Sequence, residues 1–307
     1  MRSQISDRGW LWPAQGCLSK AVVLNMTFWT PTAVIAVLLT AGCDNSRIRH
    51  VPPTPNAPGV DELAPDPKQE FKSGRFSPDS KKIAYHAVMD GTRDVVGVID
   101  LDGTHMTELA TTQSRLSSVA WSPDGKFIYF TSNAGIEQVS ITGGAASHVA
   151  DALEATEVDV SADGAALLWV KSGNLLESLK RNVPQPMVTE ETHHGRYPRF
   201  DENGGVRGFV YVGTDVPGNP LQRDILGSGG LSGYVTMALG AFPSVSVLGR
   251  DRYVITSAAG IERVTQQGER SPISDEKAAM NIDASLDGLH VVYVVSGKQS
   301  LFVASGF

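Results

Sequence analysis

The chain has 307 residues, of which 41% are hydrophobic and 19% charged, so its composition is globular and excludes a collagen-like or wholly disordered protein. Its formal net charge of -7 leaves no excess of Lys and Arg to neutralise phosphates, and we therefore expect no nucleic-acid partner. Only two cysteines are present, Cys17 and Cys43, which excludes a disulfide scaffold and a cysteine-rich zinc site.

An apolar run near the N-terminus has the layout of an export signal. Residues 33–39 are uncharged and apolar, and the small residues Ala41 and Gly42 stand directly before Cys43. The run is shorter than the roughly 20 apolar residues that a membrane-spanning helix needs, which favours a cleavable leader. Residues 1–42 are therefore predicted to be a signal peptide.

Those small residues and the cysteine resemble the lipobox of bacterial lipoproteins, in which the cysteine is acylated and becomes the new N-terminus. The resemblance implies that Cys43 is lipidated and that the exported protein is held at the bacterial cell membrane. Its domain would face the periplasm or the cell exterior. Several acyl chains, unlike a single one, anchor a protein stably. The sequence leaves open which membrane of the envelope carries the anchor.

A proline-rich segment follows the cysteine. Six prolines fall between Val51 and Pro67, with no apolar periodicity among them. Proline favours extended polyproline geometry and is excluded from helix interiors and inner strands. We therefore predict a lipidated tether over residues 43–72 and a folded domain over residues 73–307.

The rest of the chain repeats a short motif. Residues 76–85 read FSPDSKKIAY, and residues 121–130 read WSPDGKFIYF. Weaker copies lie at residues 160–169, 200–211 and 284–293, with a degenerate copy at 246–255. Equivalent positions are about 42 residues apart, which gives six repeats.

Each repeat contains the residues of a tight turn between two strands. Pro fixes φ at the first corner, Asp bonds its own backbone, and Gly takes the position with φ above zero. The β-branched and aromatic residues that follow are typical of a buried strand, and a second turn such as Asp100–Gly103 ends a third strand. Four short strands per repeat predict an all-β, six-bladed propeller of four-stranded blades. We expect the recurring aromatic residues to form its core: Trp121, Tyr129, Phe130, Trp169, Tyr211 and Tyr293.

The Trp/Phe-Ser-Pro-Asp-Gly turn followed by an aromatic-ended strand resembles the propeller repeat of TolB-type periplasmic proteins and of prolyl-oligopeptidase relatives. The resemblance covers residues 73–307 and implies the fold. It does not imply TolB's role, because TolB carries an additional N-terminal α/β domain where this chain has the proline-rich tether. The last repeat ends after its third strand, and we expect the segment near Gln69 to Gly74 to supply the missing outer strand.

The common catalytic and ligand-binding motifs are absent or incomplete in this sequence. It contains no Gly-x-Ser-x-Gly elbow, the glycine run at 227–233 lacks the Lys of a phosphate loop, and Asp100–Gly103 lacks the further ligands of a calcium loop. No catalytic residue, cofactor or metal is predicted. The candidate binding residues, on a loop or at the rim of the channel, are His193, His194, Arg196 and Tyr197. The two adjacent histidines would point to opposite sides of a strand and could not bind one ion together.

These features favour a membrane-tethered, non-catalytic binding or scaffolding protein whose partner is another envelope or periplasmic protein. The alternative is a propeller enzyme or ligand sensor of the lyase or lactonase type, with its site in the central channel. Stoichiometric calcium or zinc in the purified protein would favour that alternative. A third interpretation, an orphaned domain without a partner, fits the degraded fourth and fifth repeats.

Overall fold

The computed structural model describes ten stretches of the chain, namely residues 59–64, 68–112, 116–181, 187–201, 208–215, 217–218, 220–225, 235–238, 244–248 and 252–307. The chain divides into two compact units at residues 1–49 and 50–307, and every described residue belongs to the second. The predicted signal peptide, Cys43 and the glycine run at 227–233 lie outside the described residues. No helix in these stretches is long and apolar enough to cross a membrane.

Strands account for almost all the regular structure of the described stretches, beside one 3-10 turn at Ser172–Asn174. The first sheet consists of β2 (Gln69–Phe76), β3 (Lys82–Met89), β4 (Arg93–Asp100) and β5 (Thr107–Thr112). The second consists of β6 (Val119–Trp121), β7 (Phe127–Ser132), β8 (Gly135–Ser140) and β9 (Ser147–Ala150). In both sheets, consecutive strands pair antiparallel, as four-stranded blades require.

The second half of the chain forms one large sheet and two small ones. The large sheet has seven strands: β10 (Glu157–Val160), β11 (Ala166–Lys171), β12 (Leu175–Lys180), β13 (Met187–Asp201), β14 (Gly208–Gly213), β15 (Leu221–Ile225) and β16 (Val235–Ala238). The next has β17 (Val245–Val247), β18 (Arg252–Ser257), β19 (Gly260–Thr265) and β20 (Arg270–Ser274). The last has β21 (Ala279–Ala284), β22 (His290–Val295), β23 (Leu301–Ser305) and β1 (Gly59–Leu63).

The described strands thus form five sheets, and the prediction of six separate blades is wrong in this respect. The cause is β13, whose residues 187–194 pair with β12 and whose residues 195–201 pair with β14. One long strand is therefore the outermost strand of the third repeat and the innermost strand of the fourth. A β-bulge between Arg196 and Arg199, where Tyr197 has a φ of 55°, lies in its second half.

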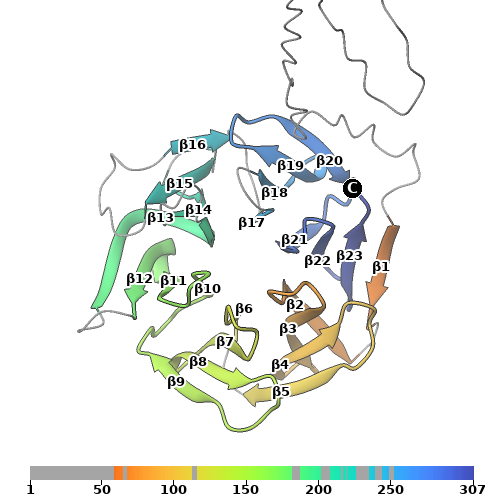
Figure 1. Ribbon diagram of the computed structural model, residues 1–307, viewed down its shortest axis with the longest axis vertical. Helices are drawn as coiled ribbons and strands as arrows, with labels where there is room; N and C mark the ends of the chain where they lie inside the picture. Colours follow the sequence, from red (N-terminus) through yellow and green to blue (C-terminus); the bar gives the residue numbers. More distant parts are fainter. Residues whose placement is uncertain are drawn as a thin grey trace, which may run out of the picture. The chain divides into compact units, whose positions relative to one another are not determined.

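The sheets are arranged radially around a common axis (Figure 1). The innermost strands contact one another in a closed circuit, in the order β2, β6, β10, β13, β17, β21 and back to β2. Apolar side chains fill the space between neighbouring sheets, and all six aromatic residues assigned to the core are buried. The all-β propeller with four-stranded blades is therefore confirmed.

The circuit is closed by β1, which pairs antiparallel with β23 so that Gly59 lies opposite Ser305. The predicted donor, Gln69–Gly74, was wrong, because that segment belongs to β2, the innermost strand of the first sheet. Phe71 is buried, as an inner strand requires, whereas only the last residue of β1, Leu63, is buried. In the described residues, sheet structure consequently includes Gly59–Leu63, which lies inside the segment predicted to be the tether.

The repeated Ser-x-Asp turns share one set of hydrogen bonds. In all four described copies the Ser Oγ donates to the Asp Oδ1 at 2.5 to 2.8 Å and accepts from the backbone N–H five residues after the Ser at 2.8 to 3.0 Å. The Ser residues are Ser77, Ser122, Ser161 and Ser285. The hydrogen bond from Ser77 holds the pKa of Asp79 below its ordinary value. The motif is therefore a turn-forming unit, as predicted.

The first of these turns carries a strained residue. Ser80 has a φ of 59° at the position where the other copies have Gly125, Gly164 and Gly288, whose φ values are 68°, 67° and 73°. The left-handed conformation costs a residue with a Cβ roughly 1–2 kcal/mol. We expect Ser80→Gly to raise the free energy of unfolding by about 1 kcal/mol, measured by urea denaturation.

The matched change at the second turn is Gly125→Ala. A Cβ built at Gly125 meets no atom closer than 4.0 Å, so steric crowding is not a factor, and the φ of 68° alone should make this variant less stable. A loss of about 1 kcal/mol is expected. Unchanged stability of both variants would contradict the assignment of strain to this turn position.

Candidate functional site

The innermost strands have one edge that faces the central axis without a neighbouring strand. Backbone N–H groups on such an edge need other acceptors when they are buried. Side chains of the preceding repeat supply them: Phe76 N donates to Asp283 Oδ2 at 2.9 Å, Phe200 N to Asp159 Oδ2 at 2.8 Å, and Ala284 N to Ser246 Oγ at 3.1 Å. At these three junctions, polar residues on the inner strands therefore link one repeat to the next.

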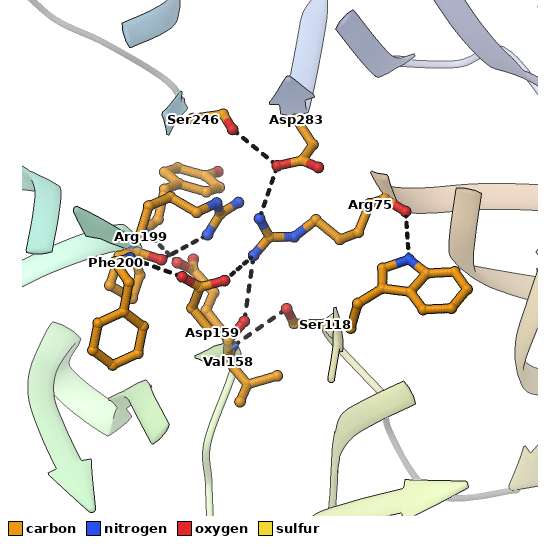
Figure 2. A network of polar contacts seen from close by, with 12 residues as sticks. Arg75, Ser118, Val158, Asp159, Arg199, Phe200, Ser246 and Asp283 are labelled. Carbon is orange, nitrogen blue, oxygen red and sulfur yellow. Dashed lines mark hydrogen bonds and ion pairs between the residues drawn. The ribbon is translucent and has the colours of Figure 1, made fainter. Parts of the chain in front are cut away.

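These acceptors occupy one position of the repeat, two residues before the first residue of the turn. Its six occupants are Arg75, Ala120, Asp159, Arg199, Ser246 and Asp283. The position faces the axis, so two cations and two anions, carried by three of the five sheets, meet there (Figure 2). We call these residues the central ring.

Arg75 is the most highly connected member of the central ring. Its Nη1 donates to Asp283 Oδ1 at 3.0 Å, and its Nη2 donates to the carbonyl oxygen of Val158 at 3.3 Å and lies 3.5 Å from Asp159 Oδ1. Ser246 Oγ donates to the same Asp283 Oδ1 at 2.8 Å. Charged groups that are taken out of water need such partners. The contacts of Arg75 therefore join three sheets across the axis.

Burial dominates the protonation of the acids near the ring. It raises the pKa of Asp159 despite the opposing charge of Arg75. It likewise raises the pKa of Glu157, although Arg196 lies 3.5 Å away and the backbone N–H of Tyr197 donates to the Glu157 carboxylate. Proton uptake by these two acids is thus easier than by acids in water.

Arg199 differs from Arg75 in having few partners. It is 7% exposed, its Nη1 donates to the carbonyl oxygen of Pro198 at 2.8 Å, and its Nε is buried without a hydrogen bond. Within the described stretches, no carboxylate lies at ion-pair distance from its guanidinium. Burial, with the neighbouring charge of Arg75, lowers its pKa to about 10, so it stays cationic at neutral pH.

A cavity of about 420 Å³ opens above the central ring. It lies on the side of the molecule that carries the Ser-x-Asp turns, which we call the turn face. The middle residue of each of the four turns lines the cavity, and all four are apolar: Pro78, Pro123, Ala162 and Leu286. We call these four residues the apolar collar. Phe76, Trp121 and Phe200 line the wall beneath it.

The residues that the sequence analysis singled out lie elsewhere. They are on strand β13 and not on a loop, and the side chain of His193 is outside the described part of the structure. His194 is exposed, and the Arg196 guanidinium lies 5.0 Å from the centre of the Tyr197 ring. None of these three described residues lines the cavity. Their role in binding stays a prediction.

A second, more polar cavity lies beside β3 and β4, lined in part by His86 and Asp94. His86 Nε2 lies 2.6 Å from Asp94 Oδ1, and burial lowers the pKa of the imidazole. His86 Nδ1 is buried without a hydrogen bond. In the described stretches, no three His, Cys, Asp or Glu residues are grouped so that they could bind one metal ion.

Comparison with known proteins identifies the fold alone. No protein-family model matches the chain, and no curated protein matches it significantly. Solved structures do match: the nidogen/laminin complex (TM-score 0.56, 14% identity, 80% of this chain and 89% of the other) and the Cps50 (Swd1) β-propeller domain of Myceliophteria thermophila (0.58, 8%, 81% and 100%). The chain is a β-propeller.

TolB from Acinetobacter baumannii is also among the similar structures, with a TM-score of 0.54 and 15% identity over 75% of this chain and 64% of TolB. The propeller architecture implied by the TolB-type repeat is therefore supported. At such low identities the likeness carries no residue-level function. The central ring and the apolar collar have to be interpreted from their own chemistry.

Proposed function

We propose that this protein is a bacterial cell-envelope lipoprotein, anchored by lipid on Cys43, whose propeller binds an envelope or periplasmic protein and catalyses no reaction. The observation that carries the proposal is the apolar collar on the turn face. The lipobox-like residues before Cys43 support the location in the envelope.

The collar exposes apolar side chains to water, and covering them with a partner would be favourable. Leu286 is 68% exposed, and Leu289, three residues further along the same connection, is also among the exposed large hydrophobic residues. Contiguous exposed apolar groups surrounded by polar residues mark sites of protein interaction. The turns also hold the collar rigidly, because each is fixed by its Ser and Asp hydrogen bonds. A preformed surface of this kind binds with little loss of conformational entropy.

A similar structure also supports a protein partner. The nidogen/laminin structure is that of a protein complex, and its propeller resembles this chain in fold. Propellers in general present a rigid ring of turns, on which binding residues vary without disturbing the core. The absence of a catalytic motif in the sequence favours binding over chemistry, and the lyase or lactonase type of site is the weaker candidate.

The test combines crosslinking in living cells with affinity capture of the tagged full-length chain. The wild type should fractionate with membranes and capture a defined envelope protein, and Cys43→Ala should move to the soluble fraction. Leu286→Asp should remain at the membrane but lose most of the captured partner, because it places a charge in an interface that excludes water.

Leu153→Asp is the matched control, since Leu153 is 58% exposed but does not line the cavity. It should capture as much partner as the wild type. Retention of the partner by Leu286→Asp would refute docking on the turn face. If Cys43→Ala stayed with the membrane, the lipid anchor would be refuted independently.

A further inference from the structure

Arg199 is the cation of the central ring that has no carboxylate partner among the described residues, and binding of a protein at the apolar collar does not explain it. A buried guanidinium normally has carboxylate or multiple carbonyl partners, because desolvation of an unpaired charge is costly. Arg199 has one hydrogen bond, to the carbonyl oxygen of Pro198, and an orphaned Nε. Figure 2 shows its guanidinium directed toward that of Arg75, so two like charges face each other.

The nearby carboxylates do not pair with Arg199, because their oxygens already accept hydrogen bonds from other groups. Asp283 binds Arg75, the backbone N–H of Phe76 and the hydroxyl of Ser246. Asp159 accepts from the backbone N–H of Phe200. The Asp159, Asp283 and Glu157 charges do raise the pKa of Arg199, but less than burial and the charge of Arg75 together lower it.

Asp201, the third acid that lines the cavity, is occupied as well. Its Oδ2 accepts from Arg223 Nε at 2.8 Å and from the Tyr253 hydroxyl at 2.9 Å. Each aspartate in the cavity wall therefore serves the fold through a backbone N–H, an arginine or a hydroxyl. Arg199 therefore lines the cavity as a cation whose N–H groups are not all hydrogen-bonded, and this cavity opens on the turn face.

The remaining cavity wall is apolar. Phe76, Trp121 and Phe200 line it above the ring, and the apolar collar surrounds it. Its volume of about 420 Å³ lies within the range of roughly 300–1,000 Å³ that is usual for small-molecule sites. A cavity with the charged central ring at its base and apolar residues above it suits a ligand with one charged end and an apolar body.

We propose that the cavity binds a small organic monocarboxylate, with its carboxylate on the Arg199 guanidinium and its apolar body against Trp121 and the collar. A planar guanidinium fork matches a carboxylate geometrically and binds it in two-pronged fashion. A single negative charge is favoured over a dianion, because three aspartates also line the cavity and would repel the second charge. The inference concerns a small molecule and goes beyond the protein-binding function proposed above.

The experiment uses isothermal titration of the purified full-length chain with three probes: 3-phenylpropionate, its neutral amide and inorganic phosphate. The wild type should bind one equivalent of 3-phenylpropionate saturably and shift the NMR signal of the Trp121 indole N–H. The amide and phosphate should bind at least tenfold more weakly. Arg199→Gln should weaken carboxylate binding by a factor of ten or more, because a charge-assisted hydrogen bond is lost.

Arg93→Gln is the control for loss of an arginine, since Arg93 is partly exposed, pairs with Glu108 on the first sheet and does not line this cavity. It should bind 3-phenylpropionate as the wild type does. A second pair of variants, at Ala162, keeps the proposal testable if Arg199→Gln does not fold. Ala162→Glu places a negative charge on the exposed collar and should weaken carboxylate binding, whereas Ala162→Gln should not.

Three outcomes would overturn the proposal. The first is no saturable binding of 3-phenylpropionate by the wild type up to roughly 10 mM, where the binding free energy falls below about 3 kcal/mol. The second is equal affinity for the acid and its amide, which would mean that the charge is not recognised. The third is unchanged affinity in both Arg199→Gln and Ala162→Glu. None of these outcomes bears on capture of a protein partner by the collar.

Discussion

Replacing Asp283 by alanine should lower the free energy of unfolding by about 3–5 kcal/mol, which is the usual cost of removing one partner of a buried ion pair. The carboxylate accepts hydrogen bonds from Arg75, from the Phe76 backbone and from Ser246. Its loss leaves the Arg75 guanidinium, itself buried, without its nearest counter-ion. Urea denaturation followed by tryptophan fluorescence would measure the change.

The double variant Arg75→Ala with Asp283→Ala provides the decisive comparison. Once Arg75 is gone, removal of Asp283 no longer leaves the Arg75 guanidinium without its counter-ion, so the double variant should be markedly more stable than the sum of the single effects implies. Asp151→Ala is the control, because the Asp151 side chain is 95% exposed, and its effect should stay within about 0.5 kcal/mol. A loss below about 1 kcal/mol for Asp283→Ala would show that the central ring does not hold the sheets together.

The second large effect is expected at the closing strand. Leu63 is 4% exposed and belongs to the apolar cluster that contains Leu301 and Val303 of β23 and Ile83 of β3. Leu63→Ala should therefore cost about 2–4 kcal/mol, as the removal of a buried leucine does. Deletion of residues 59–63 should cost more, because it also removes every ladder hydrogen bond of the β1–β23 pair. Thermal unfolding monitored by circular dichroism would measure both.

Val60→Ala is the matched control on the same strand. Val60 is 42% exposed, so its truncation removes little buried surface and should change stability by less than about 0.5 kcal/mol. Equal melting temperatures for the wild type and the chain without residues 59–63 would show that β1 does not close the propeller.

The part of the fold that could be predicted from sequence is the part encoded locally. Ser122, Asp124 and Gly125 make a turn through bonds among themselves and residues up to five positions away, so the motif predicts its own structure. Closure depends instead on a pairing between residues more than 230 positions apart, Gly59 with Ser305 and Leu63 with Leu301. Only one of the five residues of β1 is buried, so its sequence lacks the apolar alternation that predicts a strand.

The number of sheets was mispredicted for a related reason. Repeats were counted from turn motifs, and the six motif copies correspond to six innermost strand segments. Whether two repeats are separate sheets depends on how the connection between them is built. Between the third and fourth repeats that connection is the continuous strand β13, and the sequence of residues 187–201 carries no signal that distinguishes a strand from a loop followed by a strand.

The central ring was missed although its signal is present in the sequence. Arg75, Asp159 and Arg199 are charged residues inside inner strands, each two residues before the first residue of the turn. A buried strand is expected to be apolar at such positions. The histidine pair on β13 was predicted from residue type alone. Position within the repeat identifies the axis-facing residues more reliably, since only the fold decides which strand positions meet at the centre.

The pairing of β1 with β23 places the two ends of the described domain on adjacent strands, Gly59 opposite Ser305. A short linker could therefore join them, and the gene could be rearranged to begin at a connection between two other sheets. The chain would then close covalently where it now closes through hydrogen bonds. New ends at the junction between the third and fourth repeats would be harmful, because they would cut β13 in its middle.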